Sequence, residues 1–234
     1  MIDRYVIEYN LDLISKIINS EKVDSFDSQY NAAPTKLMPI VSIKSPNKVD
    51  LVHWGASSDY AKKKPLAEKL ISLDLSTFSK SNMHYNLLMS QRCIILCNGF
   101  YLWKKTSKSE RTPYYFNFIK NKIMLCVGIK DRYEDFEGNS FDYFSFISKK
   151  SNNEWKEFSD NIPIVLDFDN INKWFDKSKR FDEILDLIYQ PDISSFNYYT
   201  VSPFITDLSN NDKKLINPKS TSNQYGNYSL FDLF

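Results

Sequence analysis

The alternation of apolar and polar positions predicts many short strands and few helices. Segments rich in aromatic and β-branched residues follow one another along the middle of the chain. They are Gln91 to Cys97, Tyr101 to Lys104, Pro113 to Ile119, Lys122 to Ile129 and Phe141 to Ile147, with Leu37 to Ile43 before them and Tyr198 to Ser202 as a closing strand. Turn residues at Asn98-Gly99, Lys120-Asn121 and Glu137-Gly138-Asn139 separate them at the spacing of a meander or a barrel.

Helical periodicity is confined to short stretches. Apolar residues at helical spacing predict a helix over Leu11 to Ile18 with Asn10 as its cap. Further helices are expected within Ser79 to Ser90, Asn170 to Phe175 and Phe181 to Tyr189. We therefore expect an α+β fold, a β-rich single domain over residues 1–218 with a barrel-like antiparallel sheet core and a few peripheral helices. The shift to Ser, Asn, Gln and Tyr predicts a flexible tail over residues 219–234.

The segment from Cys93 to Trp103 carries the strongest turn signal. Asn98-Gly99 follows an apolar strand and predicts a tight aromatic hairpin, with Leu102 at its tip. Functional sites are often built at such turns, where a polar group would be expected, yet this one presents a leucine. An aromatic hairpin that packs on a core is the structural alternative.

Composition excludes several protein classes. The 234 residues carry a net charge of +1, no apolar run approaches the roughly 20 residues that cross a bilayer, and the N-terminus lacks a secretory signal. We expect a cytoplasmic monomer. The apolar surroundings of the three cysteines, Cys93, Cys97 and Cys126, predict buried free thiols. The chain has only two histidines, His53 and His84, so we expect no metal site and no cofactor.

Two basic runs neighbour tryptophans. Lys62 to Lys64 follows Trp54, and Lys104 to Lys108 follows Trp103. Such runs are commonly solvated surface, but the aromatic neighbours are also compatible with a platform for unpaired bases.

An ordered set of short segments resembles the SOS-response-associated peptidase (SRAP) family, the abasic-site-processing proteins. The most specific are Asn31 to Thr35 (NAAPT) and Gly99 to Trp103 (GFYLW). The others are Arg4-Tyr5, His53-Trp54-Gly55, Arg92-Cys93, Pro113-Tyr114-Tyr115, Val127-Gly128-Ile129, Ile162 to Leu166, Val201-Ser202-Pro203 and Leu215 to Pro218. The resemblance covers roughly residues 1 to 218.

The resemblance implies a covalent chemistry. In that family, removal of the initiator Met exposes a cysteine that captures the aldehyde of an abasic site in single-stranded DNA as a thiazolidine. An asparagine and an arginine in an Asn-Ala-Arg-Ala-Glu segment orient the sugar and a phosphate. The glutamate of Gly-Phe-Tyr-Glu-Trp and a histidine four residues before a Met-Pro proline supply acid-base chemistry.

The matching positions of this chain lack those groups. They are Ile2 for the cysteine, Ser72 for the asparagine, Asp74 for the arginine, Leu102 for the glutamate and Ser159 for the histidine. Ile2 should also prevent removal of Met1. The resemblance thus implies a pseudoenzyme of the DNA damage response, related to abasic-site sensing and processing in single-stranded DNA.

Six residues are still expected to contact single-stranded or abasic DNA. They are Arg4, Asn31, Trp54, Arg92, Trp103 and Lys104. Two alternatives stay open: an abasic-site lyase that uses the Met1 amine, and a module that binds a peptide or apolar ligand on Phe100, Leu102 and Trp103.

The end of the chain suggests a second partner. Gln224 to Phe234 ends in two Leu-Phe steps, which either fold back onto the domain or resemble the peptides that repair proteins insert into the sliding clamp.

Overall fold

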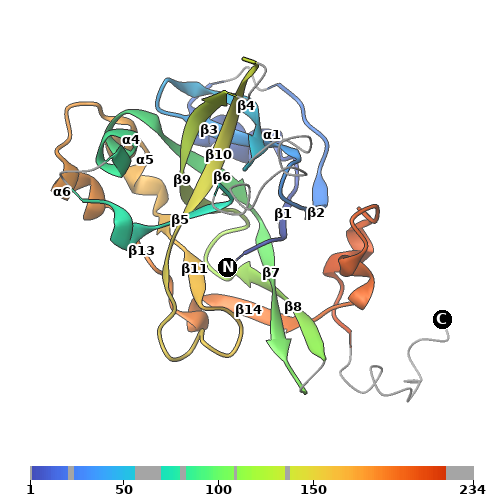
Figure 1. Cartoon of the computed structure of the whole chain (residues 1–234). Helices are drawn as coiled ribbons and strands as arrows, with labels where there is room; N and C mark the ends of the chain where they lie inside the picture. The colour runs from blue at the N-terminus through green and yellow to red at the C-terminus, as the bar shows by residue number, and fades with distance from the viewer. Residues whose placement is uncertain are drawn as a thin grey trace.

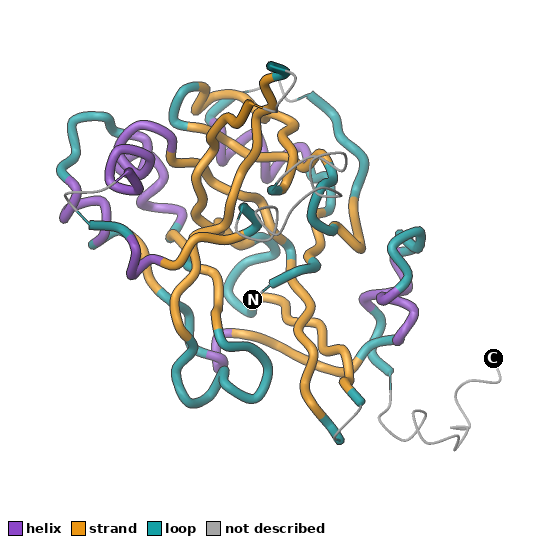
Figure 2. The backbone as a smooth tube through the Cα atoms, in the orientation of Figure 1, coloured by secondary structure: helices purple, strands orange, loops and turns teal. Residues whose placement is uncertain are grey.

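Strands hold more of the described residues than helices do, and the described helices are short and lie at the periphery (Figure 2). The computed structural model describes residues 2–20, 24–55, 70–79, 83–107, 110–134 and 138–219. The strands are β1 (Tyr5–Ile7), β2 (Gln29–Ala32), β3 (Leu37–Ser42), β4 (Ser45–Trp54), β5 (Ser72–Asp74), β6 (Arg92–Cys97), β7 (Gly99–Lys105), β8 (Arg111–Phe118), β9 (Met124–Glu134), β10 (Ser140–Lys150), β11 (Asn161–Pro163), β12 (Val165–Leu166), β13 (Ile188–Tyr189) and β14 (Phe196–Thr200). The α-helices are α1 (Leu11–Ile18), α4 (Met83–Gln91), α5 (Ile171–Phe175) and α6 (Phe181–Leu185). Single 3₁₀ turns are η1 (Leu75–Thr77), η2 (Phe168–Asn170), η3 (Ile193–Ser195), η4 (Pro203–Thr206) and η5 (Lys213–Ile216).

The larger sheet closes on itself. Strand β10 pairs with β4, which pairs in turn with β3, β6 and β9, and β9 pairs again with β10. The predicted α+β class with a barrel-like core is therefore confirmed. One detail differs from the expected antiparallel arrangement: the closing pair β4–β10 is parallel, as is β5–β10.

A second sheet lies against this barrel. Its order is β14-β8-β7-β1-β2, and every pairing is antiparallel (Figure 1). The predicted closing strand is β14, which begins two residues earlier than expected. Strand β1 was not foreseen, because three residues are too few to show a period.

Helix α1 begins and ends where the sequence predicts. The Asn10 side chain accepts a hydrogen bond of 3.0 Å from the backbone N–H of Leu13, an N-cap that stabilises a helix by about 1 kcal/mol. Asn19 ends the helix in the left-handed conformation. The buried residues Ile14, Ile17 and Ile18 share one face, and this face covers the core.

The expected hairpin at Asn98-Gly99 is wrong. Strands β6 and β7 do not pair; β6 belongs to the barrel, whereas β7 pairs with β8 and β1 in the second sheet. Gly99 is not among the positive-φ residues, so turn geometry is not the reason for this glycine. A Cβ there would lie 2.4 Å from the Tyr115 hydroxyl and 2.5 Å from the Phe116 carbonyl oxygen. Close approach of β8 therefore requires the glycine.

The alternation of β7 divides the interior into two clusters. Phe100 and Leu102 point into the main core, which also fills the barrel. Tyr101 and Trp103 point to the opposite face, into a small second cluster with Val6, Tyr115, Val201, Ile205 and Leu215. Leu102 therefore lies within a central strand of its sheet, not at a hairpin tip.

The cysteine prediction is confirmed, since Cys93, Cys97 and Cys126 are free and buried. Among the residues described, no helix is long and apolar enough to cross a membrane. The tail beyond residue 219, the Lys62 to Lys64 run and Met1 lie outside the described residues. The clamp-docking and Met1-amine hypotheses therefore stay predictions.

Candidate functional site

The N-terminal segment brings the second residue of the chain to the edge of the main core. The backbone N–H of Tyr101 donates a hydrogen bond of 3.1 Å to the carbonyl oxygen of Arg4, which fixes this segment beside β7. Ile2 is 4% exposed and belongs to the same cluster as Leu102. A hydrocarbon side chain thus occupies the position at which the resembled family carries its nucleophile.

Leu102 is 2% exposed. It lies opposite Tyr114 in the β7–β8 register, and Phe100, two residues earlier on the same face, is also buried. Phe100 and Leu102 therefore offer no open apolar surface to a ligand in this part of the structure, which leaves Trp103 as the one partly exposed residue of the ligand-binding alternative. An ionised side chain at position 102 would have to be desolvated.

Ser72 and Asp74 lie on β5, which runs parallel to β10. The Ser72 hydroxyl donates a hydrogen bond of 2.8 Å to the Ser148 hydroxyl across that pair. The Asp74 carboxylate accepts one of 2.8 Å from the backbone N–H of Ser76 and so caps η1. Both side chains serve local structure.

Ser159 lies in the turn that leads into β11. Its hydroxyl donates a hydrogen bond of 2.8 Å to the carbonyl oxygen of Asn161 and accepts one of 3.3 Å from the Asn161 N–H. A serine hydroxyl in these hydrogen bonds is far less basic than an imidazole, and its side chain is shorter.

Arg92 is buried, so the expectation that it contacts DNA is wrong. It is 0% exposed, and its guanidinium donates hydrogen bonds only to backbone carbonyl oxygens. The acceptors are Leu88 and Met89 at the end of α4, Trp174 in α5, and Asp176 just after it. Burial lowers the pKa of Arg92 to about 10, an effect that the charge of Asp176 opposes. Arg92 joins two helix ends to the barrel.

Trp54 and Asn31 are also structural, which corrects their expected contacts with DNA. Trp54 is buried, and its ring stacks on that of Phe144 with 6.5 Å between the ring centroids. Its indole N–H donates a hydrogen bond to the carbonyl oxygen of Ile71. The buried Asn31 amide donates to the carbonyl oxygens of Ile205, Asp207 and Asn210. No base can reach the face of Trp54 in this arrangement.

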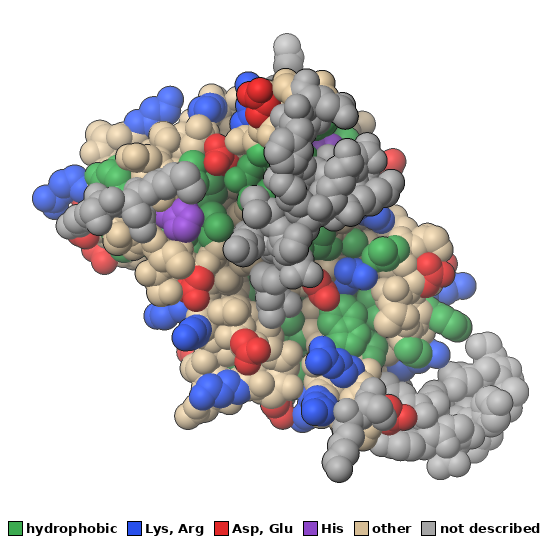
Figure 3. Space-filling model, in the orientation of Figure 1, with side chains coloured by type: hydrophobic (Ala, Val, Ile, Leu, Met, Phe, Trp, Pro, Cys, Tyr) green, Lys and Arg blue, Asp and Glu red, His purple; other side chains and the backbone are tan. Residues whose placement is uncertain are grey.

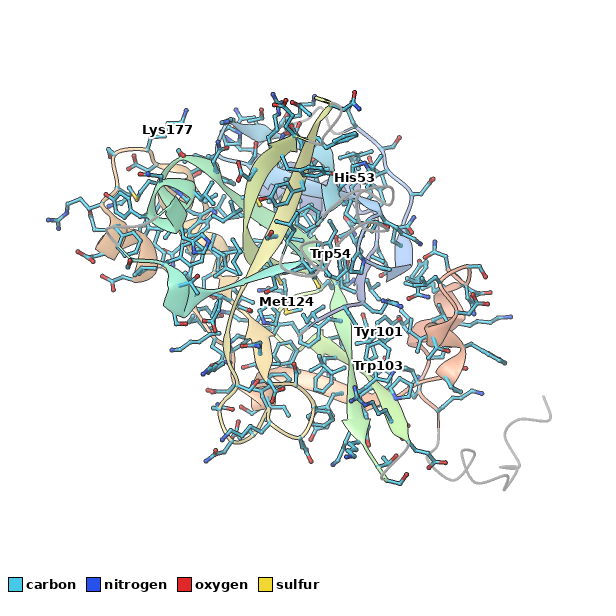
Figure 4. The ribbon with its side chains drawn as sticks, in the orientation of Figure 1. His53, Trp54, Tyr101, Trp103, Met124 and Lys177 are labelled. Carbon is cyan, nitrogen blue, oxygen red and sulfur yellow. The ribbon has the colours of Figure 1, made fainter. Side chains whose placement is uncertain are left out.

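Lys104 and Trp103 have different roles although they are adjacent. The Lys104 ammonium forms an ion pair of 2.6 Å with the Glu157 carboxylate. The same nitrogen lies 5.5 Å from the centroid of the Phe158 ring. Its hydrogen bond to Glu157 raises the pKa of Lys104. Trp103 is only half-buried, and Figure 4 shows it next to Tyr101 on β7. Trp103 is therefore the tryptophan that can still stack on a base.

Three further cations lie near Trp103 or near Arg4. Lys105 faces Arg111 across the β7–β8 hairpin, and Lys36 follows the NAAPT segment. Burial lowers the pKa of Lys36, and the nearby charge of Arg4 lowers it further. We call Arg4, Lys36, Trp103, Lys105 and Arg111 the basic face.

The basic face holds few counter-charges. Within the described residues, none of its cations forms an ion pair with a carboxylate at 4.0 Å or less. The nearby carboxylate is Asp3: desolvation raises its pKa, and the charges of Arg4 and Arg111 oppose that rise. The Arg4 Nε is buried and unpaired. Figure 3 shows Lys and Arg side chains around an apolar area, below the centre of the view.

Comparison with known proteins agrees with the resemblance of the motifs. The sequence model of one family, SOS response associated peptidase (SRAP), matches residues 1–208. The abasic site processing protein YoqW of Bacillus subtilis is 26% identical over 208 residues, 86% of this chain and 93% of that protein. The abasic site processing protein HMCES of Xenopus tropicalis is 24% identical over 229 residues, 80% of this chain and 65% of that protein.

A solved structure supports the fold. A protein from Bacteroides thetaiotaomicron superposes with a TM-score of 0.78 at 19% identity, over 93% of this chain and 99% of that one. At this identity the likeness extends to the fold alone.

Proposed function

This chain belongs to the SRAP family, and from that premise we propose that it is a non-catalytic member that binds single-stranded DNA, abasic sites included, without a covalent crosslink. The observation that carries the proposal is the burial of Ile2 and Leu102, two hydrocarbon side chains, at the positions matching the family's nucleophile and acid-base glutamate. Relatives named as abasic site processing proteins supply the class of substrate.

The loss of chemistry follows from the groups themselves. Capture of an aldehyde as a thiazolidine needs an amine and a thiol on one residue, and isoleucine has no thiol. Leu102 can neither donate nor accept a proton, and the Ser159 hydroxyl is engaged with Asn161. An adduct with an amine alone would remain open to hydrolysis.

The basic face supports retained strand binding. Arg4, Lys36, Lys105 and Arg111 can neutralise phosphates, and the half-buried Trp103 can stack on a base. A carboxylate at the position of the family's phosphate-facing arginine, Asp74, would repel a phosphate. The Asp74 carboxylate accepts a hydrogen bond from the Ser76 N–H in its own turn, which favours an orientation away from a bound strand.

Salt dependence of binding tests this proposal. Fluorescence anisotropy of a labelled single strand should give an affinity that falls steeply with salt, and Arg111→Ala should reduce the slope of log K against log salt by about 0.7. Lys104→Ala is the matched control, because Lys104 is paired with Glu157 and should leave the slope unchanged. Absence of binding at low salt, or equal effects of the two variants, would refute the role of the basic face.

A further inference from the structure

A polar cleft of about 560 Å³ is lined neither by the basic face nor by Ile2, Ser72, Leu102 or Ser159. It opens between the end of β1, the start of α1, β8 and the segment around η5. Its walls include the rings of Tyr9, Tyr30 and Tyr199. A cleft of this volume with aromatic walls and a few polar groups is the usual form of a small-molecule site.

Two residues of β8 line this cleft, Tyr115 and Asn117. The Asn117 Oδ1 is buried with no hydrogen bond from any residue that the structure describes. Tyr115 and Asn117 are two residues apart on a strand and so share one face. Gly99 lies opposite Asn117 in the register, and a Cβ there would be 2.4 Å from the Tyr115 hydroxyl. The glycine thus makes the space that this hydroxyl occupies.

Three neighbouring polar side chains, those of Asn98, Tyr30 and Tyr199, are already hydrogen-bonded. Asn98 accepts a hydrogen bond of 2.8 Å from the Glu8 N–H and donates one of 2.7 Å to the Lys122 carbonyl oxygen. The hydroxyls of Tyr30 and Tyr199 donate to the Glu8 carboxylate and the Ile216 carbonyl oxygen at 3.0 and 2.8 Å. By contrast, the Asn117 Oδ1 is buried without a hydrogen bond from the described part of the chain. A buried acceptor with no donor calls for a partner.

The charge of the lining indicates what that partner carries. Lys213 lies 2.8 Å from the Glu8 carboxylate, and these two charges cancel. Lys122 forms no ion pair with a described residue, and its ammonium gives the lining an excess of one positive charge. An occupant with an anionic end therefore fits.

We propose that this cleft binds one nucleotide, with the edge of its base on the Asn117 amide and the Tyr115 hydroxyl and its phosphate at Lys122. A side-chain amide pairs with the adjacent donor and acceptor of an adenine edge, and tyrosine rings are suited to the faces of a base. Two sources supply such a nucleotide, a free mononucleotide or one unit of a single strand, and the experiment below distinguishes them. The proposal is independent of the basic face, because none of the five residues of the basic face lines the cleft.

Calorimetry with the full chain separates the parts of this proposal. We expect 5′-dAMP to bind more tightly than deoxyadenosine, and deoxyadenosine more tightly than ribose 5-phosphate. Tyr115→Phe should weaken dAMP and deoxyadenosine alike by about tenfold, 1.4 kcal/mol. Lys122→Ala should weaken dAMP and leave deoxyadenosine unchanged. Tyr114→Phe, one residue along β8 on its opposite face, is the control and should bind as the wild type does.

A short single strand distinguishes the sources. If only the strand binds, and Tyr115→Phe and Lys122→Ala both weaken it, the cleft holds one unit of DNA; if free dAMP binds, it holds a mononucleotide. The proposal is overturned if neither ligand binds, if Tyr115→Phe binds as tightly as the wild type, or if ribose 5-phosphate equals dAMP. Loss of strand binding in Arg111→Ala alone bears on the basic face and not on the cleft.

Discussion

The backbone N–H of Tyr101 donates a hydrogen bond of 3.1 Å to the carbonyl oxygen of Arg4. This bond joins the beginning of the chain to the strand that carries Leu102. Ile2 and Leu102, which the family motifs match to a nucleophile and an acid-base group, are both buried hydrocarbon side chains.

Leu102→Glu should destabilise the protein by about 3 kcal/mol or more, because a carboxylate would be buried at a position that is 2% exposed and opposite a tyrosine. Urea unfolding measures the loss. Leu102→Met conserves volume and should cost less than about 1.5 kcal/mol. Equal unfolding midpoints for wild type and Leu102→Glu would mean that water reaches position 102.

Arg92→Lys should cost about 3 kcal/mol, because a single ammonium cannot replace a planar fork bonded to four carbonyl oxygens. Arg180→Lys, at an arginine whose side chain is 84% exposed, should change stability by less than about 0.5 kcal/mol. Strand binding by the folded fraction should stay constant in both variants. A selective loss of binding in Arg92→Lys would restore Arg92 as a DNA contact.

Strand affinity should decline with rising pH before the usual lysine value of 10.5 is reached. Burial and the charge of Arg4 lower the pKa of Lys36, so this side chain loses its proton, and its attraction to phosphate, earlier than an ordinary lysine. Lys36→Arg keeps its charge and should remove this part of the decline. Lys104→Arg is the control, since pairing with Glu157 already raises the pKa of Lys104. Identical pH profiles for wild type and Lys36→Arg would exclude Lys36 from the contact.

Ile2→Cys should crosslink to abasic single-stranded DNA weakly at best. The change supplies the thiol and permits removal of Met1, but Leu102 and Ser159 still provide no acid-base group. Denaturing gels of the variant with abasic and intact strands measure the yield. A yield equal to that of a family member with cysteine at position 2 would show that the nucleophile alone suffices.

The sequence predicts local structure well where short-range forces decide it. Helix α1 follows from its apolar spacing and from the Asn10 cap, and both are observed. The pairing of β7 depends instead on β1 and β8, and no local pattern distinguishes a hairpin at Asn98-Gly99 from a passage between two sheets. The role of Gly99 becomes visible only with Tyr115 in place.

For the candidate site, motifs give some of the residues, whereas the burial of others depends on tertiary packing. Ile2, Leu102 and Ser159 are predicted, from the motifs around them alone, to stand at the family's site positions. Arg92 and Trp54 were assigned to DNA because arginine and tryptophan commonly contact nucleic acids, but tertiary packing buries both. Lys36 and Arg111 were not predicted because they are far apart in sequence. The β7–β8 pairing brings Arg111 opposite Lys105, and Lys36 lies close enough to Arg4 for the two charges to interact.

The most direct test of a non-catalytic SRAP protein is incubation of the wild-type chain with abasic single-stranded DNA, followed by boiling in detergent and a denaturing gel. A family member with cysteine at position 2 serves as the positive control, and a parallel sample receives borohydride. We expect no shifted band in either wild-type sample. A heat-stable band would contradict it, and a band only after borohydride would show a Schiff base on an amine such as that of Met1, which would also contradict the loss of covalent chemistry.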